Sequence, residues 1–90
     1  MHYVYILKSE HFRKSYVGHT GDIRKRLIQH NSGESHYTKR YKPWILIYNE
    51  AFLSLEDAIK REKFLKSRSG RREMKKIFEN LARSSNDSPR

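Results

Sequence analysis

Short apolar stretches mark the strands of this chain. His2–Leu7 is rich in aromatic and β-branched residues, and Ser15–Thr20 repeats this composition after a polar segment, Ser9–Lys14. Such runs predict two strands joined by a hairpin loop. Trp44–Phe52 begins as a continuous apolar run, which predicts a third strand that is central in the sheet and buried on both faces.

Helical signals separate the second strand from the third. Asp22 is a suitable helix N-cap and Gly33 a suitable residue to end a helix, so Asp22–Ser32 is predicted to be helical. Glu34–Lys42 then follows as a basic loop that contains aromatic residues. Gly18 stands near the end of the second strand, where the backbone is expected to pass close to another group.

Two further helices follow the third strand. Ser54 and Asp57 resemble a capping box at the start of the first of them. Apolar side chains recur at helical spacing at Leu55, Ala58, Ile59 and Leu65 and, beyond Gly70, at Met74, Ile77, Phe78 and Leu81. From Arg83 the chain has little to bury, so we expect one domain over residues 1–82 and a disordered tail over 83–90. This order of elements predicts an α/β or α+β fold in which helices cover a small, mostly antiparallel sheet.

The charge balance indicates what kind of partner the chain binds. Twenty Lys and Arg stand against ten Asp and Glu, which gives a formal net charge of +10 in 90 residues. Because neutralised phosphates release condensed counterions, such an excess favours nucleic acid as the partner. An acidic membrane surface and simple solubility are the alternatives.

Other functions are excluded by what the composition lacks. The chain has no cysteine, which excludes a disulfide framework, a zinc ribbon and thiol catalysis, and which suits the reducing cytoplasm. No apolar run is long enough to cross a bilayer, and the N-terminus does not resemble a signal peptide. We therefore expect a cytoplasmic protein without a membrane partner.

Three polar side chains interrupt the apolar stripes of the predicted helices. Arg26 and His30 are four residues apart, on or beside the stripe that Ile23 and Leu27 define. Glu62 lies in the middle of the next stripe, where an ionised carboxylate is costly unless it is paired or binds a metal. A buried salt bridge between Arg26 and Glu62, with a structural His30, is one explanation. A phosphodiester site that combines a cation, an imidazole and a carboxylate is the other.

Two tyrosines are expected near these residues. Tyr5 and Tyr16 belong to neighbouring strands and can approach each other if the strands form a hairpin. Strand tyrosines are common packing residues, so a place in the core is the alternative for each.

The motifs in this order resemble those of the GIY-YIG nuclease family, from Tyr3 to about Arg72. The resemblance rests on Tyr3-Val4-Tyr5, Tyr16-Val17-Gly18, Arg26, His30-Asn31, Lys42-Pro43-Trp44, Asp57-Ala58, Arg61-Glu62 and Leu65-Lys66. Either short motif alone is weak, whereas both together, with the arginine, histidine and glutamate in the same order and spacing, are specific. The chain is most similar to the short, stand-alone bacterial branch of the family.

This resemblance implies a three-stranded antiparallel sheet flanked by three helices, as in GIY-YIG endonucleases, and one divalent metal ion, Mg²⁺ or Mn²⁺. Glu62 would bind the metal, and Arg26 would contact the scissile phosphate. Tyr5 or Tyr16 would position or deprotonate the attacking water, and His30 lies where some members have an assisting base or a phosphate contact. The expected substrate is DNA, recognised by its structure more than its sequence, in repair or recombination.

Two positions depart from the family pattern. Tyr3 replaces the first glycine of the first motif, which leaves the motif's tyrosine, Tyr5, in place. Many full nucleases carry an asparagine about a helix length beyond the metal glutamate, whereas this chain has Arg71-Arg72-Glu73-Met74 there. A non-catalytic nucleic-acid-binding module with a decayed nuclease site is therefore the alternative function.

The basic loop is a candidate contact surface for the substrate. Lys39, Arg40 and Lys42 would follow the phosphates, and Tyr37 could stack on an unpaired base. A loop that is merely solvated is the alternative. A chain of this size has no separate recognition domain, so we expect a protein partner to supply any sequence specificity. An interaction subunit that docks an acidic protein or ribosomal RNA is a further alternative function.

Overall fold

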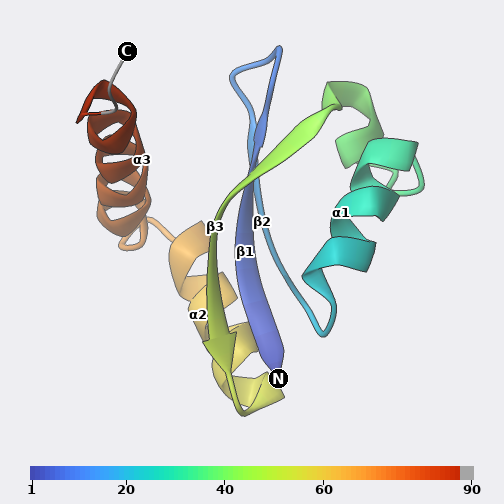
Figure 1. The fold of residues 1–90 in the computed structure, drawn as a ribbon. Helices are drawn as coiled ribbons and strands as arrows, with labels where there is room; N and C mark the ends of the chain where they lie inside the picture. The colour runs from blue at the N-terminus through green and yellow to red at the C-terminus, as the bar shows by residue number, and fades with distance from the viewer. Residues whose placement is uncertain (88–90) are drawn as a thin grey trace.

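The chain folds as a three-stranded sheet with helices on both faces (Figure 1). The computed structural model describes residues 1–87. The elements in chain order are β1 (His2–Ser9), β2 (Ser15–Thr20), α1 (Ile23–Ser32), a 3₁₀ helix η1 (Thr38–Tyr41), β3 (Trp44–Phe52), α2 (Leu55–Lys66) and α3 (Arg71–Asp87). This is the antiparallel α+β architecture that the sequence predicted.

The central strand is β1 and not β3. β1 pairs antiparallel with β2 on one side and with β3 on the other, so the strand order is β2-β1-β3. The prediction that Trp44–Phe52 is central and buried on both faces is therefore wrong. An apolar run indicates burial but does not specify which strand has two neighbours, and Ile45 on the edge strand is 48% exposed. Four consecutive buried residues, Val4–Leu7, give β1 the two-sided burial of a central strand.

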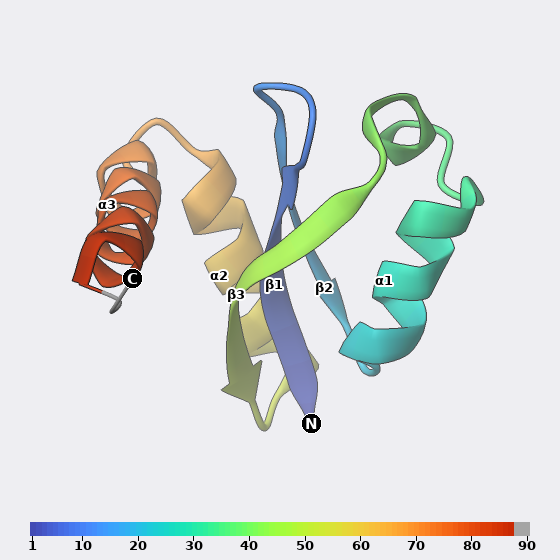
Figure 2. The same ribbon diagram turned by 45° about the horizontal axis from the view of Figure 1, so that its top comes forward.

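Successive residues of β1 face two separate cores. Val4 and Ile6 lie in the larger apolar cluster, on the face covered by α2 and α3. Tyr5 and Leu7 lie in a second cluster with Trp44, on the face covered by α1. Figure 2 shows this division, with α2 and α3 on one side of the sheet and α1 on the other. Because side chains alternate along a strand, adjacent residues of β1 serve different helices.

The predicted starts of α1 and α2 and the end of α1 are confirmed. The Asp22 side chain accepts a hydrogen bond of 3.1 Å from the backbone N–H of Lys25 at the start of α1. Gly33 ends α1 with a φ of 87°, in the left-handed region that glycine adopts without a steric penalty. The Ser54 hydroxyl caps α2 by accepting from the backbone N–H of Asp57 at 3.3 Å.

The C-terminal boundary differs from its expected position. Residues 83–87 continue α3, where we expected the tail 83–90 to begin. The last part of that tail, 88–90, lies outside the described residues, so the extent of the domain stays a prediction. Among the described residues, no helix has the length and apolar character needed to cross a bilayer.

Candidate active site

The predicted site residues meet along β2, the edge strand opposite β3. Tyr16 of β2 lies 4.9 Å from His30 of α1, measured between ring centroids. The Nζ atom of Lys66, from α2, lies 5.8 Å from the centre of the same tyrosine ring. Since α1 and α2 cover opposite faces of the sheet, the site is assembled around the edge of β2 and not on a single face.

Tyr5 fits into this edge because its partner in β2 is a glycine. Tyr5 is opposite Gly18 in the antiparallel register, and its ring centroid lies 6.2 Å from that of Tyr16. A Cβ atom on Gly18 would lie 2.7 Å from the Tyr5 hydroxyl oxygen, which is closer than a Cβ atom approaches another heavy atom. The close approach expected at Gly18 is therefore that of the Tyr5 phenol.

Behind Tyr5, a chain of hydrogen bonds extends into the protein. The Tyr5 hydroxyl is bonded to His30 Nε2 at 2.9 Å, and His30 Nδ1 is bonded to the Thr38 hydroxyl at 2.7 Å. The Thr38 carbonyl accepts a bond of 2.8 Å from the indole N–H of Trp44. Both ring nitrogens of His30 thus have partners, and its side chain has no exposed surface. Since His30 is buried, it can affect a substrate only through the groups that pack against it, such as Tyr5 and Tyr16.

Burial keeps this pair neutral. It lowers the pKa of His30 to about 4, with the positive charge of Arg26 adding to the effect. It also raises the pKa of Tyr5 to about 12, although Arg26 acts in the opposite direction. An imidazole and a phenol with these pKa values stay uncharged at neutral pH, so they position neighbouring groups more readily than they transfer protons.

Arg26 brings a cation to the same phenols. Its Nη1 atom donates to the side-chain oxygen of Gln29 at 3.0 Å, and the side chain is partly buried. Burial lowers the pKa of Arg26, but the hydroxyls of Tyr5 and Tyr16 outweigh this effect and raise it above its ordinary value. The guanidinium is therefore a fixed positive charge beside both tyrosines.

Glu62 supplies the negative charge of the site. One carboxylate oxygen lies 2.5 Å from His19 Nδ1, and the other accepts from Lys66 Nζ at 2.6 Å. Burial raises the pKa of Glu62, but Lys66 and His19 outweigh it, so the pKa lies below the ordinary value and the carboxylate is ionised. Among the described side chains no ion pair joins Arg26 to Glu62, so the buried salt bridge considered for these two residues is not formed.

Two residues of this cluster, Lys66 and His19, were given no site role from the sequence. Lys66 is four residues after Glu62 on a helix, a spacing that brings side chains together, so its position was available as a signal. His19 follows Gly18 in β2 and therefore points to the opposite face, where α2 lies. Nothing in the sequence indicates that α2 would cover that face.

The side chains around Glu62 suit a divalent ion that is held by few protein ligands more than one that is enclosed by several. In the described part of the chain, no three His, Cys, Asp or Glu side chains are grouped as metal ligands. Mg²⁺ commonly takes one or two carboxylates and completes its coordination with water and substrate phosphate. An ionised Glu62 carboxylate is one such ligand, and Met74 contributes nothing to it because it packs against the larger apolar cluster.

The basic loop packs against the site and is not merely solvated. Residues Thr38–Tyr41 form η1, and Thr38 is fully buried in contact with His30. Tyr37 is 49% exposed, and its ring centroid lies 6.2 Å from that of Tyr16. The remaining predicted contacts of this loop, Lys39, Arg40 and Lys42, are exposed. The loop therefore places Tyr37 next to Tyr16 of β2 and leaves its cations exposed.

The fold is that of a GIY-YIG domain. A family model described as the GIY-YIG catalytic domain matches residues 1–76. The chain therefore belongs to the GIY-YIG domain family.

Relatives of similar length support this assignment. The chain is 40% identical over 79 residues to a UPF0213 protein of Staphylococcus saprophyticus, a match that covers 87% of this chain and 95% of the relative. It is 39% identical over 83 residues to a UPF0213 protein of Syntrophus aciditrophicus, covering 90% and 94%. The solution NMR structure of a UPF0213 protein from Bacillus halodurans is similar in fold, with a TM-score of 0.51, 34% identity, and coverage of 84% of this chain and 83% of that one.

Proposed function

We propose that this protein is a divalent-metal-dependent endonuclease that hydrolyses phosphodiester bonds in DNA. Membership of the GIY-YIG family supports nuclease chemistry, and the net charge of +10 supports a polyanionic substrate. The observation that carries the proposal is the meeting of an ionised Glu62 with a cationic Arg26 and two tyrosines along one sheet edge. This set contains a phosphate-binding cation, a metal-binding carboxylate and hydroxyls for a water molecule.

Arg26 is the residue we assign to the scissile phosphate. Its guanidinium can donate charge-assisted hydrogen bonds to the non-bridging oxygens, where negative charge increases in the transition state. Gln29 fixes one of its nitrogens at 3.0 Å, which orients the guanidinium before a substrate arrives. This orientation supports a role in the transition state and not only in binding.

Tyr16 is the tyrosine we assign to the attacking water. Tyr5 is only 2% exposed, its hydroxyl is bonded to His30, and its pKa is about 12, all of which suit a positioning residue. Tyr16 is less buried and has Lys66 beside its ring. A water hydrogen-bonded to the Tyr16 hydroxyl would attack phosphorus while the bond to the leaving oxygen breaks. The water's proton would pass to the Tyr16 oxygen as the phenol releases its own proton to solvent, and the leaving oxygen would take up a proton from solvent.

Glu62 is the residue that would hold the divalent ion. When bound, such an ion polarises the phosphate and stabilises the leaving oxygen. Lys66 and His19 now occupy both carboxylate oxygens, so at least one of them would have to move aside. The Lys66 side chain is 49% exposed and can do so without leaving a buried polar group unpaired.

Nicking of supercoiled plasmid in Mg²⁺ or Mn²⁺ tests the proposal. We expect cleavage by the purified protein that disappears in chelator and in Glu62→Gln. Glu56→Gln is the matched control, because Glu56 lies on the same helix with its side chain 79% exposed and paired only with Lys60 at the surface. Cleavage that persists in Glu62→Gln, or that is lost equally in Glu56→Gln, would contradict the role of Glu62.

The apolar packing of Met74 favours one second candidate, a DNA-binding module without catalysis. The position where many family members carry a supporting asparagine faces the core here. In that case the protein would bind DNA with equal affinity with and without metal, and no substrate would be cut. The same plasmid assay, read beside a binding assay, separates the two functions.

A further inference from the structure

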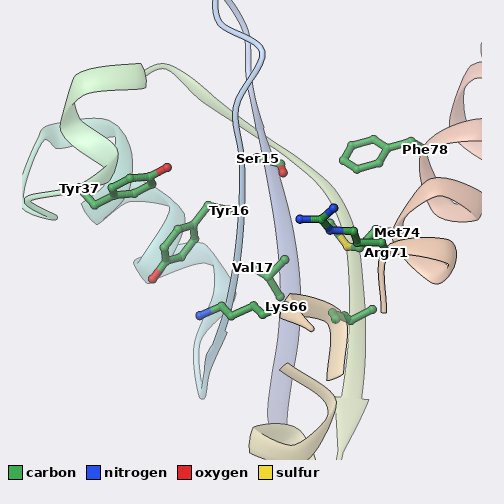
Figure 3. Close-up of a pocket in the computed structure, with 9 residues that line it drawn as sticks. Ser15, Tyr16, Val17, Tyr37, Lys66, Arg71, Met74 and Phe78 are labelled. Carbon is green, nitrogen blue, oxygen red and sulfur yellow. The ribbon is translucent and has the colours of Figure 1, made fainter. Parts of the chain in front are cut away.

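A groove beside the catalytic cluster runs from the edge of β2 towards α3. It has a volume of about 430 Å³, in the range of sites for small organic ligands. Figure 3 shows Tyr16 and Tyr37 on one side of it and Met74 and Phe78 of α3 on the other, with Val17 between them. The groove therefore has an aromatic wall and an apolar floor.

Cations lie at the rim of this groove. Lys66, at the C-terminal end of α2, and Arg71, at the start of α3, both line it and are exposed. Among the described residues, no Asp or Glu side chain lines it. A ligand that suits it has a flat, largely apolar part and carries negative charge, which is the chemistry of a nucleotide.

The groove is continuous with the catalytic cluster. Tyr16 belongs to both, and Lys66 binds Glu62 while it lines the groove. A base in the groove would thus belong to a nucleotide beside the phosphodiester held by Arg26. Tyr37 contributes an aromatic ring that is 49% exposed and whose hydroxyl makes no hydrogen bond to another described residue. An exposed ring of this kind is suited to stacking on a base.

We propose that this groove binds an unpaired nucleobase next to the cleaved phosphodiester, so that the protein prefers single-stranded or flapped DNA to continuous duplex. The inference rests on the proposed function and adds the substrate class to it. In a duplex, each base is stacked on its neighbours and cannot offer its face to Tyr37 without leaving the helix. An unpaired base avoids that unstacking, so stacking contributes more to the affinity for single strands.

The experiment measures binding in chelator, where no cleavage occurs. A fluorescent base analogue is placed in an oligonucleotide that is used alone and as a duplex with its complement. We expect tighter binding and a stacking-dependent fluorescence change with the single strand. Tyr37→Ala should weaken single-strand binding about tenfold while duplex binding stays within about twofold, because base stacking on aromatic rings is removed. Tyr37→Phe keeps the ring and should retain the wild-type affinity.

A second pair of variants tests the rim. Arg71→Ala should weaken single-strand binding more than Arg72→Ala, which removes the same charge from the neighbouring exposed residue outside the groove. Equal affinity for single strand and duplex, or equal losses in Tyr37→Ala and Tyr37→Phe, would overturn the assignment of the groove. Metal-dependent cleavage could still be found in that case, and the proposed function would stand. Discrimination of single strands without cleavage of any substrate would support the groove and overturn the catalytic proposal.

Discussion

Arg61 and Glu62 are consecutive residues of α2, yet their charges have different surroundings. Arg61 donates to Glu50 of β3 at 2.7 Å and to Glu73 of α3 at 2.9 Å, and its side chain is 22% exposed. Glu50 also accepts a hydrogen bond from Tyr48 at 2.6 Å. This network is closed, since each charge has partners on a different element of the fold. Glu50 contributes most to raising the pKa of Arg61 above its ordinary value.

Glu62 belongs to an open cluster. Its partners, His19 and Lys66, are 37% and 49% exposed in their side chains, whereas Glu62 itself is 16% exposed. Either partner can turn into solvent, where water replaces the carboxylate. A partly buried charge stabilises the fold when its partners are held by other elements. When its partners can leave, it remains available to a ligand.

The largest effect is expected for Glu62→Gln, which should remove activity without a comparable loss of stability. We expect cleavage to fall to background while the free energy of unfolding changes by less than about 1 kcal/mol, as for a solvent-accessible ion pair. Urea unfolding and plasmid nicking on the same preparation measure both quantities. A loss of stability that accounts for the loss of cleavage would mean that Glu62 is structural.

Arg61→Met should have the opposite result. Removing the guanidinium leaves Glu50 partly buried without its cation, so we expect the free energy of unfolding to fall by about 1–3 kcal/mol. Cleavage per folded molecule should remain, because Arg61 does not contact the site. Lys60→Met is the matched control, since Lys60 is 71% exposed and its ion pair at 3.8 Å is on the surface. Equal losses in the two variants would show that the network does not stabilise the fold.

The contrast between Arg61 and Glu62 could be predicted only in part from the sequence. Glu62 was identified because a carboxylate in the middle of an apolar stripe conflicts with the helical pattern. The network of Arg61 gave no such signal, because its partners Glu50 and Glu73 lie 11 and 12 residues away on other elements. Which charges meet across elements depends on how β3 and α3 pack against α2, and periodicity does not contain that information.

The strand order could not be predicted from the sequence, for a related reason. The three strands, the starts of α1 and α2, the end of α1 and the antiparallel class follow from local patterns and are confirmed, whereas η1 and the length of α3 were not predicted. Val4–Leu7 and the apolar part of Trp44–Phe52 are both apolar runs, so the choice of the central strand depends on which one the helices cover from both sides. The same choice brings His19 to α2 and Tyr5 to α1, which is why His19 was missed.

The same comparison applies to the face covered by α1, where His30 belongs to a closed hydrogen-bond network of neutral groups. Its pKa is about 4 in the folded protein against 6.5 for an ordinary histidine, so between these values the unfolded chain binds more protons. The stability from neutral His30 is complete above about pH 6.5 and is lost as the pH falls towards 4. We expect a slope of up to about 1.4 kcal/mol per pH unit in this window.

The measurement for His30 is the difference in slope between the wild type and His30→Gln in urea unfolding from about pH 7 to about pH 4. The variant lowers stability at every pH, so the slope and not the absolute value carries the prediction. Carboxylates such as Glu62, whose pKa is also below its ordinary value, lose stability at low pH in both proteins. Their contribution therefore cancels in the difference. Parallel curves would show that His30 does not titrate differently on folding.

The smallest expected effect concerns charges that have no protein partner. Among the residues whose side chains the structure describes, Lys39 and Arg40 form no ion pair, and both are exposed in the basic loop. Replacing both with Ala should leave stability within about 0.5 kcal/mol. It should also reduce the slope of log affinity against log salt concentration by about 0.7–0.9 for each DNA phosphate that the variant no longer neutralises. Lys75→Ala with Lys76→Ala removes the same charge from α3 and should change the slope less. Equal slopes in the two double variants would mean that the salt dependence reflects net charge alone. A smaller slope in the Lys39 and Arg40 variant would show that this loop contacts the DNA.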